Sequence, residues 1–165
     1  MNPLLMTKRI PDIEFLRDLK ILLGKCQLIS EIPNKHPAIV FDIDGTLLYE
    51  NTDIPITSVI KFCNYCKEIG IATMIVTARR GCDLNINATK KQLETFGLNC
   101  DAFYFRHPEE TDIETFKTNV RKHLSENLNY NILMSIGDNL WDMGEWGGVG
   151  IHMAASNNVI TYQIV

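Results

Sequence analysis

Short apolar runs alternate with stretches of helical periodicity along most of this chain, and no other feature of the sequence restricts the fold as strongly. The apolar runs expected to be strands lie at 38–43, 71–78, 101–105 and 130–137. The stretches of helical spacing between them lie at 56–69, 86–96 and 112–127. A parallel pair of strands needs a crossover connection, which is usually a helix of this length. The sequence therefore predicts an α/β fold, a three-layer Rossmann-like parallel sheet with helices on both faces.

The two ends of the chain depart from this alternation. Near the C-terminus, residues 148–154 and 159–165 have the composition of two closing strands. Before the first strand, residues 12–30 have helical spacing, with an inward face expected from Ile13, Phe15, Leu16, Leu19, Ile21, Leu22 and Leu23. We therefore expect a helical N-terminal arm at 1–36, packed on an α/β core at 37–165.

Composition and charge exclude several classes of function. The net charge of −4 and the pI of about 5.5 give no overall positive field, so nucleic acid is expected only as a substrate. Residues 1–23 contain no apolar run long enough for a signal peptide or a membrane span. Five cysteines, an odd number, suggest free thiols in a reducing compartment. We expect a cytoplasmic protein without a membrane partner, and the sequence leaves homo-oligomerisation open.

The stretch "IVFDIDGTLL", residues 39–48, ends a predicted strand in two acids. Three apolar residues lead directly into Asp42 and Asp44. Side chains at positions i and i+2 of a strand point to the same face, so two like charges would lie side by side at the end of a buried strand. A capped turn would explain them structurally, whereas a ligand site would explain why they are paired.

Other polar residues follow the neighbouring strands, where ligands bind in parallel α/β sheets. Thr77 and Arg79 follow the second strand in "TARR", Asp138 and Asp142 follow the fourth in "GDNLWD", and Lys117 lies in the helix after the third. Four carboxylates at one edge of the sheet would repel one another. A divalent cation removes that conflict, and an all-oxygen set of ligands suits Mg²⁺.

These motifs resemble, in order and spacing, those of the haloacid dehalogenase (HAD) superfamily of phosphotransferases. "FDIDGTLL" is similar to the first motif, Asp-x-Asp-Gly-Thr, and "IVTARR" is similar to the second, a strand that ends in threonine. Lys117 fits the third motif and "SIGDNLWDM" the fourth, so the resemblance spans about residues 37–155. Lys117, Arg121 and "GDNLWDMG" are most similar to the acid phosphatase branch that uses four aspartates. The resemblance implies a HAD-like fold and a phosphatase activity.

The same resemblance implies roles for individual residues. Asp42 would be the nucleophile that forms an aspartyl-phosphate, and Asp44 would be the general acid and base. Mg²⁺ would be held by the carboxylates of Asp42 and Asp138 and by the backbone carbonyl of Asp44. The residues expected to bind the phosphate are Gly45, Thr77, Ala78 and Lys117. The residues expected to support the site are Asp142, Arg79 and Asn139.

The motif spacing also bears on the substrate. The intervals from Asp44 to Thr77 and from Thr77 to Lys117 are too short for a cap domain, so we expect a capless, open site. One hypothesis is a Mg²⁺-dependent phosphomonoester hydrolase acting on a small ester such as a nucleotide. A second is a phosphatase for polynucleotide ends or phosphoproteins, since the first motif is also similar to phosphatase domains that trim polynucleotide ends. A third, a non-catalytic phosphate-binding module, would have no use for Asp44.

Four further residues have both a structural and a functional interpretation. One of Arg79 and Arg80 is expected to form a salt bridge and the other to be a surface charge, unless Arg79 contacts the substrate. Arg121 is either a structural partner or part of the site, and Trp141 either packs in the core or lines the entrance.

Overall fold

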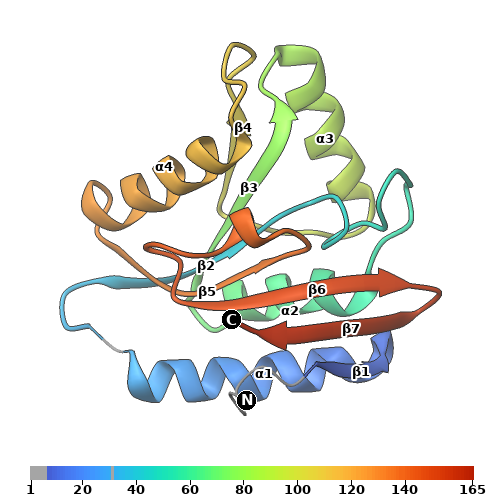
Figure 1. Cartoon of the computed structure of the whole chain (residues 1–165), viewed down its shortest axis with the longest axis vertical. Helices are drawn as coiled ribbons and strands as arrows, with labels where there is room; N and C mark the ends of the chain where they lie inside the picture. Colours follow the sequence, from blue (N-terminus) through green and yellow to red (C-terminus); the bar gives the residue numbers. More distant parts are fainter. Residues whose placement is uncertain (1–6, 31) are drawn as a thin grey trace.

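The computed structural model describes residues 7–30 and 32–165, which form a seven-stranded sheet with helices packed against it (Figure 1). The strands are β1 (Lys8–Pro11), β2 (His36–Phe41), β3 (Ala72–Arg80), β4 (Ala102–Arg106), β5 (Tyr130–Gly137), β6 (Val149–Ser156) and β7 (Val159–Ile164). The helices are α1 (Asp12–Ile29), α2 (Thr57–Glu68), α3 (Asp83–Thr95), α4 (Ile113–Glu126) and the short 3-10 helix η2 (Leu140–Asp142). Part of the expected N-terminal arm, at 1–6 and 31, lies outside the described residues.

The strands lie in the order β1-β7-β6-β5-β2-β3-β4. The five strands from β6 to β4 are parallel, which confirms the predicted Rossmann-like core. β7 pairs antiparallel with both β6 and β1, so the sheet is mixed rather than purely parallel. Asn157 and Asn158 join β6 to β7 and both have positive φ, as a two-residue hairpin turn requires. This tight turn makes β7 antiparallel, because a parallel connection needs a far longer crossover.

Strand β1 was not foreseen in the sequence. It pairs with β7 from Lys8↔Tyr162 to Pro11↔Val159 and forms one edge of the sheet. The described residues before position 37 therefore contain both an edge strand and the predicted helix. A four-residue run with two basic residues carries no strand signal of its own, and only the partner strand makes it one.

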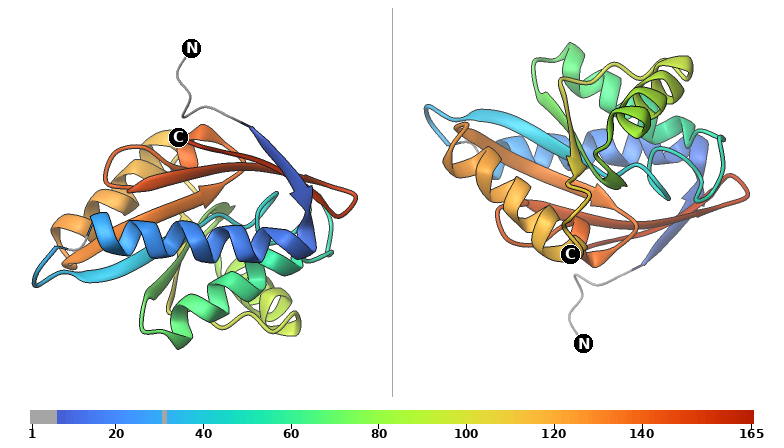
Figure 2. Two further views of the ribbon diagram at one scale, coloured as in Figure 1. Left: turned by 90° about the horizontal axis from the view of Figure 1, so that it is seen from below. Right: turned by 90° about the horizontal axis from the view of Figure 1, so that it is seen from above.

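Helices cover both faces of the sheet, as predicted. Ile39 and Phe41 of β2 belong to the apolar cluster that packs against α1, α2 and α3. Ala38 and Val40 belong to a second cluster that packs against α4. The period-two alternation of side chains along a strand produces this division. Figure 2 allows α4 to be followed on the side away from α2 and α3.

Helix α1 docks through a narrower stripe than the sequence suggested. Its buried apolar residues are Phe15, Leu19, Leu23 and Cys26, which are spaced three and four apart. Ile13 and Ile21 were expected to face inward, but their exposed fractions are 87% and 49%. They lie off the stripe that begins at Phe15, so the helix turns them to solvent.

No inserted domain separates the strands that carry the site. The interval between β2 and β3 holds a loop and α2, and the interval between β3 and β4 holds α3. The expectation of a capless fold is therefore confirmed for the described residues. Among the same residues, no helix combines the length and the apolar character needed to cross a membrane.

Candidate active site

Lys117 is the centre of a polar cluster at the carboxyl ends of β2, β3 and β5. Its ammonium group donates to Asp42 Oδ1 at 2.8 Å, to Asp142 Oδ1 at 2.6 Å and to the backbone carbonyl of Val76 at 2.8 Å. These bonds use all three lysine donors. Burial opposes the charged form, but the two carboxylates outweigh it and raise the pKa of Lys117. The three bonds therefore fix the position of the ammonium group, and its two carboxylate partners favour its charged form.

The cluster contains more negative than positive charge. Asp42, Asp138 and Asp142 each offer a carboxylate oxygen, and these oxygens lie within 4.8 Å of one another. Burial raises the pKa of Asp138 to about 8, and a hydrogen bond with Asp42 and the charge of Asp42 add to the effect. Burial and then the charge of Asp42 raise the pKa of Asp142 to about 6, although Lys117 opposes the change. Lys117 pairs with two of the three acids, so burial and the neighbouring carboxylates together raise the pKa of both Asp138 and Asp142.

A divalent cation fits this arrangement chemically. The donor atoms are carboxylate oxygens, which hard cations prefer, and their combined charge exceeds what Lys117 neutralises. Asp42 and Asp138 come from the loops after β2 and β5, so the two ends of the strands would share the ion.

The loop after β5 orients its two acids through Asn139. The side-chain amide of Asn139 donates to Asp138 Oδ1 at 3.2 Å, and its backbone N–H donates to Asp142 Oδ2 at 3.1 Å. The ring of His152 bonds to the backbone carbonyl of Asp138 at 3.0 Å. These bonds hold the acids before any ligand arrives.

Gly45 allows the loops after β2 and β5 to approach each other. Its φ of +80° favours glycine, and a Cβ there would lie 2.4 Å from Asp138 Oδ2. Its N–H was expected to face a phosphate, but it donates to the carbonyl of Leu48 at 2.7 Å. The observed contribution of Gly45 is therefore space for Asp138.

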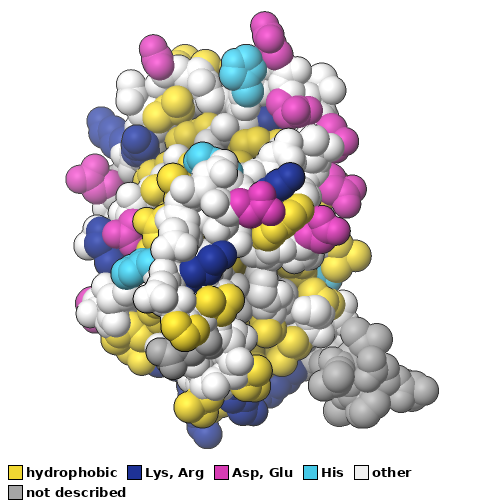
Figure 3. All heavy atoms as spheres, turned by 90° about the vertical axis from the view of Figure 1, so that its left-hand side faces the viewer, with side chains coloured by type: hydrophobic (Ala, Val, Ile, Leu, Met, Phe, Trp, Pro, Cys, Tyr) yellow, Lys and Arg dark blue, Asp and Glu magenta, His cyan; other side chains and the backbone are white. Residues whose placement is uncertain are grey.

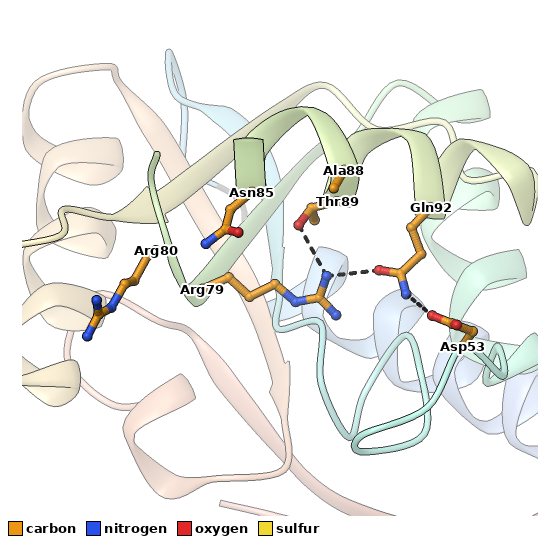
Figure 4. A pocket seen from close by; sticks show the side chains of 7 residues that line it. All are labelled: Asp53, Arg79, Arg80, Asn85, Ala88, Thr89 and Gln92. Atoms are coloured by element: carbon orange, nitrogen blue, oxygen red, sulfur yellow. Dashed lines mark hydrogen bonds between the residues drawn. The ribbon is translucent and has the colours of Figure 1, made fainter. Parts of the chain in front are cut away.

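Asp44 lies in a separate ion pair with Arg79. The Arg79 guanidinium donates to Asp44 through Nε at 3.0 Å and through Nη2 at 2.7 Å, a bidentate arrangement. The hydrogen bond with Asp44 raises the pKa of Arg79 against the effect of burial. Figure 4 shows the other side of the guanidinium held by Thr89 at 3.1 Å and Gln92 at 2.8 Å. Gln92 in turn donates to Asp53, so the β2–α2 loop and α3 both fix the position of Arg79.

Thr77 and Ala78, near the end of β3, each accept a hydrogen bond. The hydroxyl of Thr77 is buried and accepts the N–H of Arg79 at 3.1 Å. The carbonyl of Ala78 accepts Nε of Arg106 at 2.9 Å. Arg106 therefore fixes the strand end that carries Thr77 and Ala78.

Arg121 holds the loop after η2 rather than entering the cluster. Its guanidinium donates to the carbonyls of Glu145 at 3.0 Å, Trp141 at 2.9 Å and Met143 at 3.2 Å. The residue is buried, while the exposed fraction of Trp141 is 37%. The structural interpretation of Arg121 is the one that its bonds support, and Trp141 is not part of the core.

The predicted residues thus fall into two adjoining groups. Asp42, Lys117, Asp138 and Asp142 form the cluster, and Asp44 and Arg79 form the ion pair beside it. Sequence reasoning missed Thr89, Gln92 and Asp53, which hold Arg79. Thr89 and Gln92 lie three apart and so share a helix face, but nothing in the sequence indicates that this face meets Arg79.

Comparisons with known proteins agree with this geometry. A sequence model of the family described as "HAD superfamily, subfamily IIIB (Acid phosphatase)" matches residues 50–163. The match begins after Asp42 and Asp44 and includes Thr77, Lys117 and the loop after β5. No curated protein matches the chain.

Two solved structures share the fold. The chain matches one titled "Structure of the Pnkp1/Rnl/Hen1 RNA repair complex" with a TM-score of 0.63 and 15% identity, over 78% of this chain and 45% of that one. It matches another, "Structure of Pnkp1/Rnl/Hen1 complex", with a TM-score of 0.57 and 16% identity, over 69% and 44%. The chain therefore spans less than half the length of these solved chains.

The family match covers well over half of the chain and includes Lys117, Asp138 and Asp142 of the cluster. The chain belongs to subfamily IIIB of the HAD superfamily, a family of phosphatases.

Proposed function

We propose that the protein is a Mg²⁺-dependent phosphomonoester hydrolase that works through an aspartyl-phosphate, with a small ester such as a nucleotide as substrate. The observation that carries this proposal is the position of Asp42, 2.8 Å from buried Lys117 and next to Asp138 and Asp142. A carboxylate needs no base to become a nucleophile near pH 7. Its neighbours supply a lysine and a cation site in a largely buried setting.

The proposed reaction has two displacements at phosphorus. An oxygen of Asp42 bonds to phosphorus while the bond to the leaving oxygen breaks, and Asp44 gives its proton to that oxygen. Water then attacks the phosphorus and gives a proton to Asp44, and the bond to Asp42 breaks to release inorganic phosphate. The ion pair with Arg79 holds the carboxyl group of Asp44 in place beside the cluster.

Lys117 and the end of β3 are proposed to bind the phosphoryl group. Lys117 places a positive charge beside Asp42, where it stabilises the charge on the transferring oxygens. Thr77 and Ala78 lie at the end of β3, and Gly45 provides the space that Asp138 occupies. Asp142 holds Lys117 in position through the 2.6 Å bond.

The proposed ligands of Mg²⁺ are the carboxylates of Asp42 and Asp138 and the backbone carbonyl of Asp44. The ion would supply positive charge to a cluster that otherwise repels a phosphate dianion. Asp142 lies close enough to contribute through its second oxygen or through water.

A second candidate function is removal of phosphate from polynucleotide ends or phosphoproteins. The absence of a cap between the described strands leaves the site open to a large substrate. The two solved chains with this fold come from complexes whose titles name Pnkp1, Rnl and Hen1, one of them as an RNA repair complex. The chemistry at Asp42 would be the same for either substrate.

The decisive experiment measures hydrolysis of a panel of phosphate esters by the parent protein and by Asp42→Asn. The variant keeps the shape of the side chain but removes the attacking charge, so we expect hydrolysis to fall at least roughly 10³-fold, or more than about 4 kcal/mol of barrier. Glu126→Gln, the same change on the exposed end of α4, is the matched control and should keep full activity. If Asp42→Asn keeps about a tenth of the parent activity, the covalent mechanism is wrong.

A further inference from the structure

A hollow of about 520 Å³ lies beside Arg79, the ion-pair partner of Asp44 (Figure 4). Its walls are the end of β3, the face of α3 that carries Asn85 and Thr89, and the loop that carries Asp53. We call it the α3 hollow. Its volume is within the range of pockets that hold small ligands or part of a larger one.

The α3 hollow adjoins the group that is proposed to act on the leaving oxygen. Arg79 lies in its wall, and the same guanidinium holds the carboxylate of Asp44. If Asp44 protonates the leaving oxygen, the part of the substrate that departs lies on this side of the cluster. The chemistry of the hollow therefore indicates which leaving groups the site prefers.

The charges in the wall leave one arginine unbalanced. Arg79 is neutralised by Asp44, and Asp53 accepts from Gln92. The side chain of Arg80 also lines the hollow, and no ion pair joins it to the described part of the chain. In the pairing of β3 with β4, Arg80 lies directly beside Arg106. The guanidinium of Arg106 donates to the backbone carbonyls of Ala78 and Glu110, whereas that of Arg80 has no carboxylate partner among the described residues and is therefore available to an anion.

The remaining lining contains hydrogen-bonding groups and no aromatic side chain. The amide of Asn85, in the first turn of α3, makes no hydrogen bond to the other residues drawn in Figure 4. Ala88 is the only apolar residue in the wall, which contains no aromatic ring for a base to stack on. Arginine and amide donors with no aromatic ring beside them suit a phosphate oxygen better than a nucleobase.

We propose that the α3 hollow binds a second phosphate group carried by the leaving part of the substrate, with Arg80 and Asn85 as its donors. The proposal rests on the proposed phosphatase function and narrows its substrate class. A bisphosphorylated small molecule and a phosphorylated nucleic-acid end share this chemistry, because each carries a further phosphate near the scissile one.

The first experiment measures binding in the Asp42→Asn background, where turnover does not interfere. Calorimetry compares a nucleoside 3′-monophosphate with the matching 3′,5′-bisphosphate. We expect the bisphosphate to bind about tenfold more tightly, as one added charge-assisted contact to an exposed arginine would give. Adding Arg80→Gln or Asn85→Ala should reduce that preference to about twofold or less, whereas Lys91→Gln, on an exposed part of α3 outside the hollow, should leave it intact.

The second experiment separates the sources of the phosphate and the two proposals. The parent enzyme is assayed on p-nitrophenyl phosphate, on the two nucleotides and on a 3′-phosphorylated oligonucleotide. A kcat/KM for the oligonucleotide well above that for the bisphosphate would identify a nucleic-acid end, and the reverse would identify a small molecule; both outcomes support the hollow. Equal affinity for monophosphate and bisphosphate, or a preference that survives Arg80→Gln, would overturn the α3 hollow while leaving the phosphatase function intact. No turnover of any ester would reject the phosphatase function, and the binding preference would still decide the hollow.

Discussion

Two ion pairs position the side chains of the proposed active site, and they differ in burial and in role. Lys117 is buried with Asp42 and Asp142, where the loss of one partner would leave an uncompensated charge. Arg79 and Asp44 form their pair nearer the surface, where water screens it. The first pair fixes the proposed nucleophile, and the second holds the proposed general acid where solvent reaches it.

The proposed role of Asp44 predicts a dependence on the leaving group. Asp44→Asn cannot donate a proton, so hydrolysis of alkyl phosphates should fall about 10²- to 10⁴-fold. The loss should be much smaller for p-nitrophenyl phosphate, whose leaving oxygen needs little protonation. The measurement is kcat for both classes of ester in parent and variant. Equal losses on the two esters would remove Asp44 from the acid role.

Gly45→Ala tests whether the approach of the two loops matters. An added Cβ would lie 2.4 Å from Asp138 Oδ2, so we expect activity to fall at least roughly tenfold as Asp138 is displaced. The positive φ should also lower the free energy of unfolding by roughly 1–2 kcal/mol. Gly97→Ala is the matched control, because its φ is +79° and nothing lies within 4 Å of the added Cβ. The control should lose similar stability in urea unfolding but keep its activity, and a matching loss of activity would contradict the explanation.

The sequence predicted the positions of site residues that directly follow a strand. Asp42, Asp138 and Asp142 follow strands, and the carboxyl ends of parallel strands meet at one edge. The choice of Arg79 over Arg80 as partner of Asp44 depends on where α3 docks, which no local pattern specifies. The bond from the Gly45 N–H to Leu48 was missed for a related reason, since the turn type was not evident from the motif.

At the scale of elements, the direction of each strand depended on the length of the connection to its neighbour. Helices between strands predicted the parallel core, because a crossover of that length permits it. The Asn157–Asn158 pair between two apolar runs was the available signal for an antiparallel hairpin. Strand β1 could not be predicted, since its identity comes from pairing with β7 and from contacts made by α1.

Asp18 connects three of these elements through hydrogen bonds, and from these bonds we expect the stability of the protein to depend on pH. From α1 it accepts from Lys8 of β1 at 2.7 Å and from the hydroxyl of Tyr162 of β7. Burial raises the pKa of Asp18, but the bonds from Lys8 and Tyr162 outweigh it, so the net shift is downward. A lowered pKa gives stability that is complete above the unfolded value of about 3.9 and lost as the pH falls through the folded value.

Asp18→Asn should therefore melt about 2–4 °C lower than the parent near pH 7, as expected for one partly exposed pair in a chain of this size. The difference should shrink as the pH falls below about 4. Glu94→Gln, on the exposed side of α3, should show no such difference. Thermal melting from pH 3 to about pH 7 is the measurement, and a constant difference across that range would contradict the assignment.

The whole molecule carries its charges without a broad field of either sign. The net charge is −4, and basic and acidic side chains are interspersed on the face shown in Figure 3. Attraction of a phosphate must therefore be local, from Lys117, Arg79 and Arg80 at one edge of the sheet. Association with such a substrate should be less sensitive to salt than in a protein with a large basic surface.

Removal of divalent cations should abolish activity without unfolding the protein. In a chelator, Asp42, Asp138 and Asp142 would face an incoming phosphate dianion with Lys117 as their cation, so binding and attack should both fail. We expect recovery with Mg²⁺ and with Mn²⁺, and inhibition by Ca²⁺, which takes looser coordination. The buried core around Ile39 and Ile75 does not involve the ion, so melting should change little. Activity and melting of one sample test both: full turnover in chelator refutes the metal site, and global unfolding would make the ion structural.

Helix α4 both covers one face of the sheet and supplies Lys117 to the proposed active site. In the described residues it alone covers the second face of the sheet, and it carries both Lys117 and Arg121. If α4 moved away from the sheet, the cluster would lose Lys117. At the same time, η2 and the loop after it would lose the hydrogen bonds that Arg121 donates. The proposed catalytic activity and the integrity of that face should therefore be lost together, as one cooperative unit.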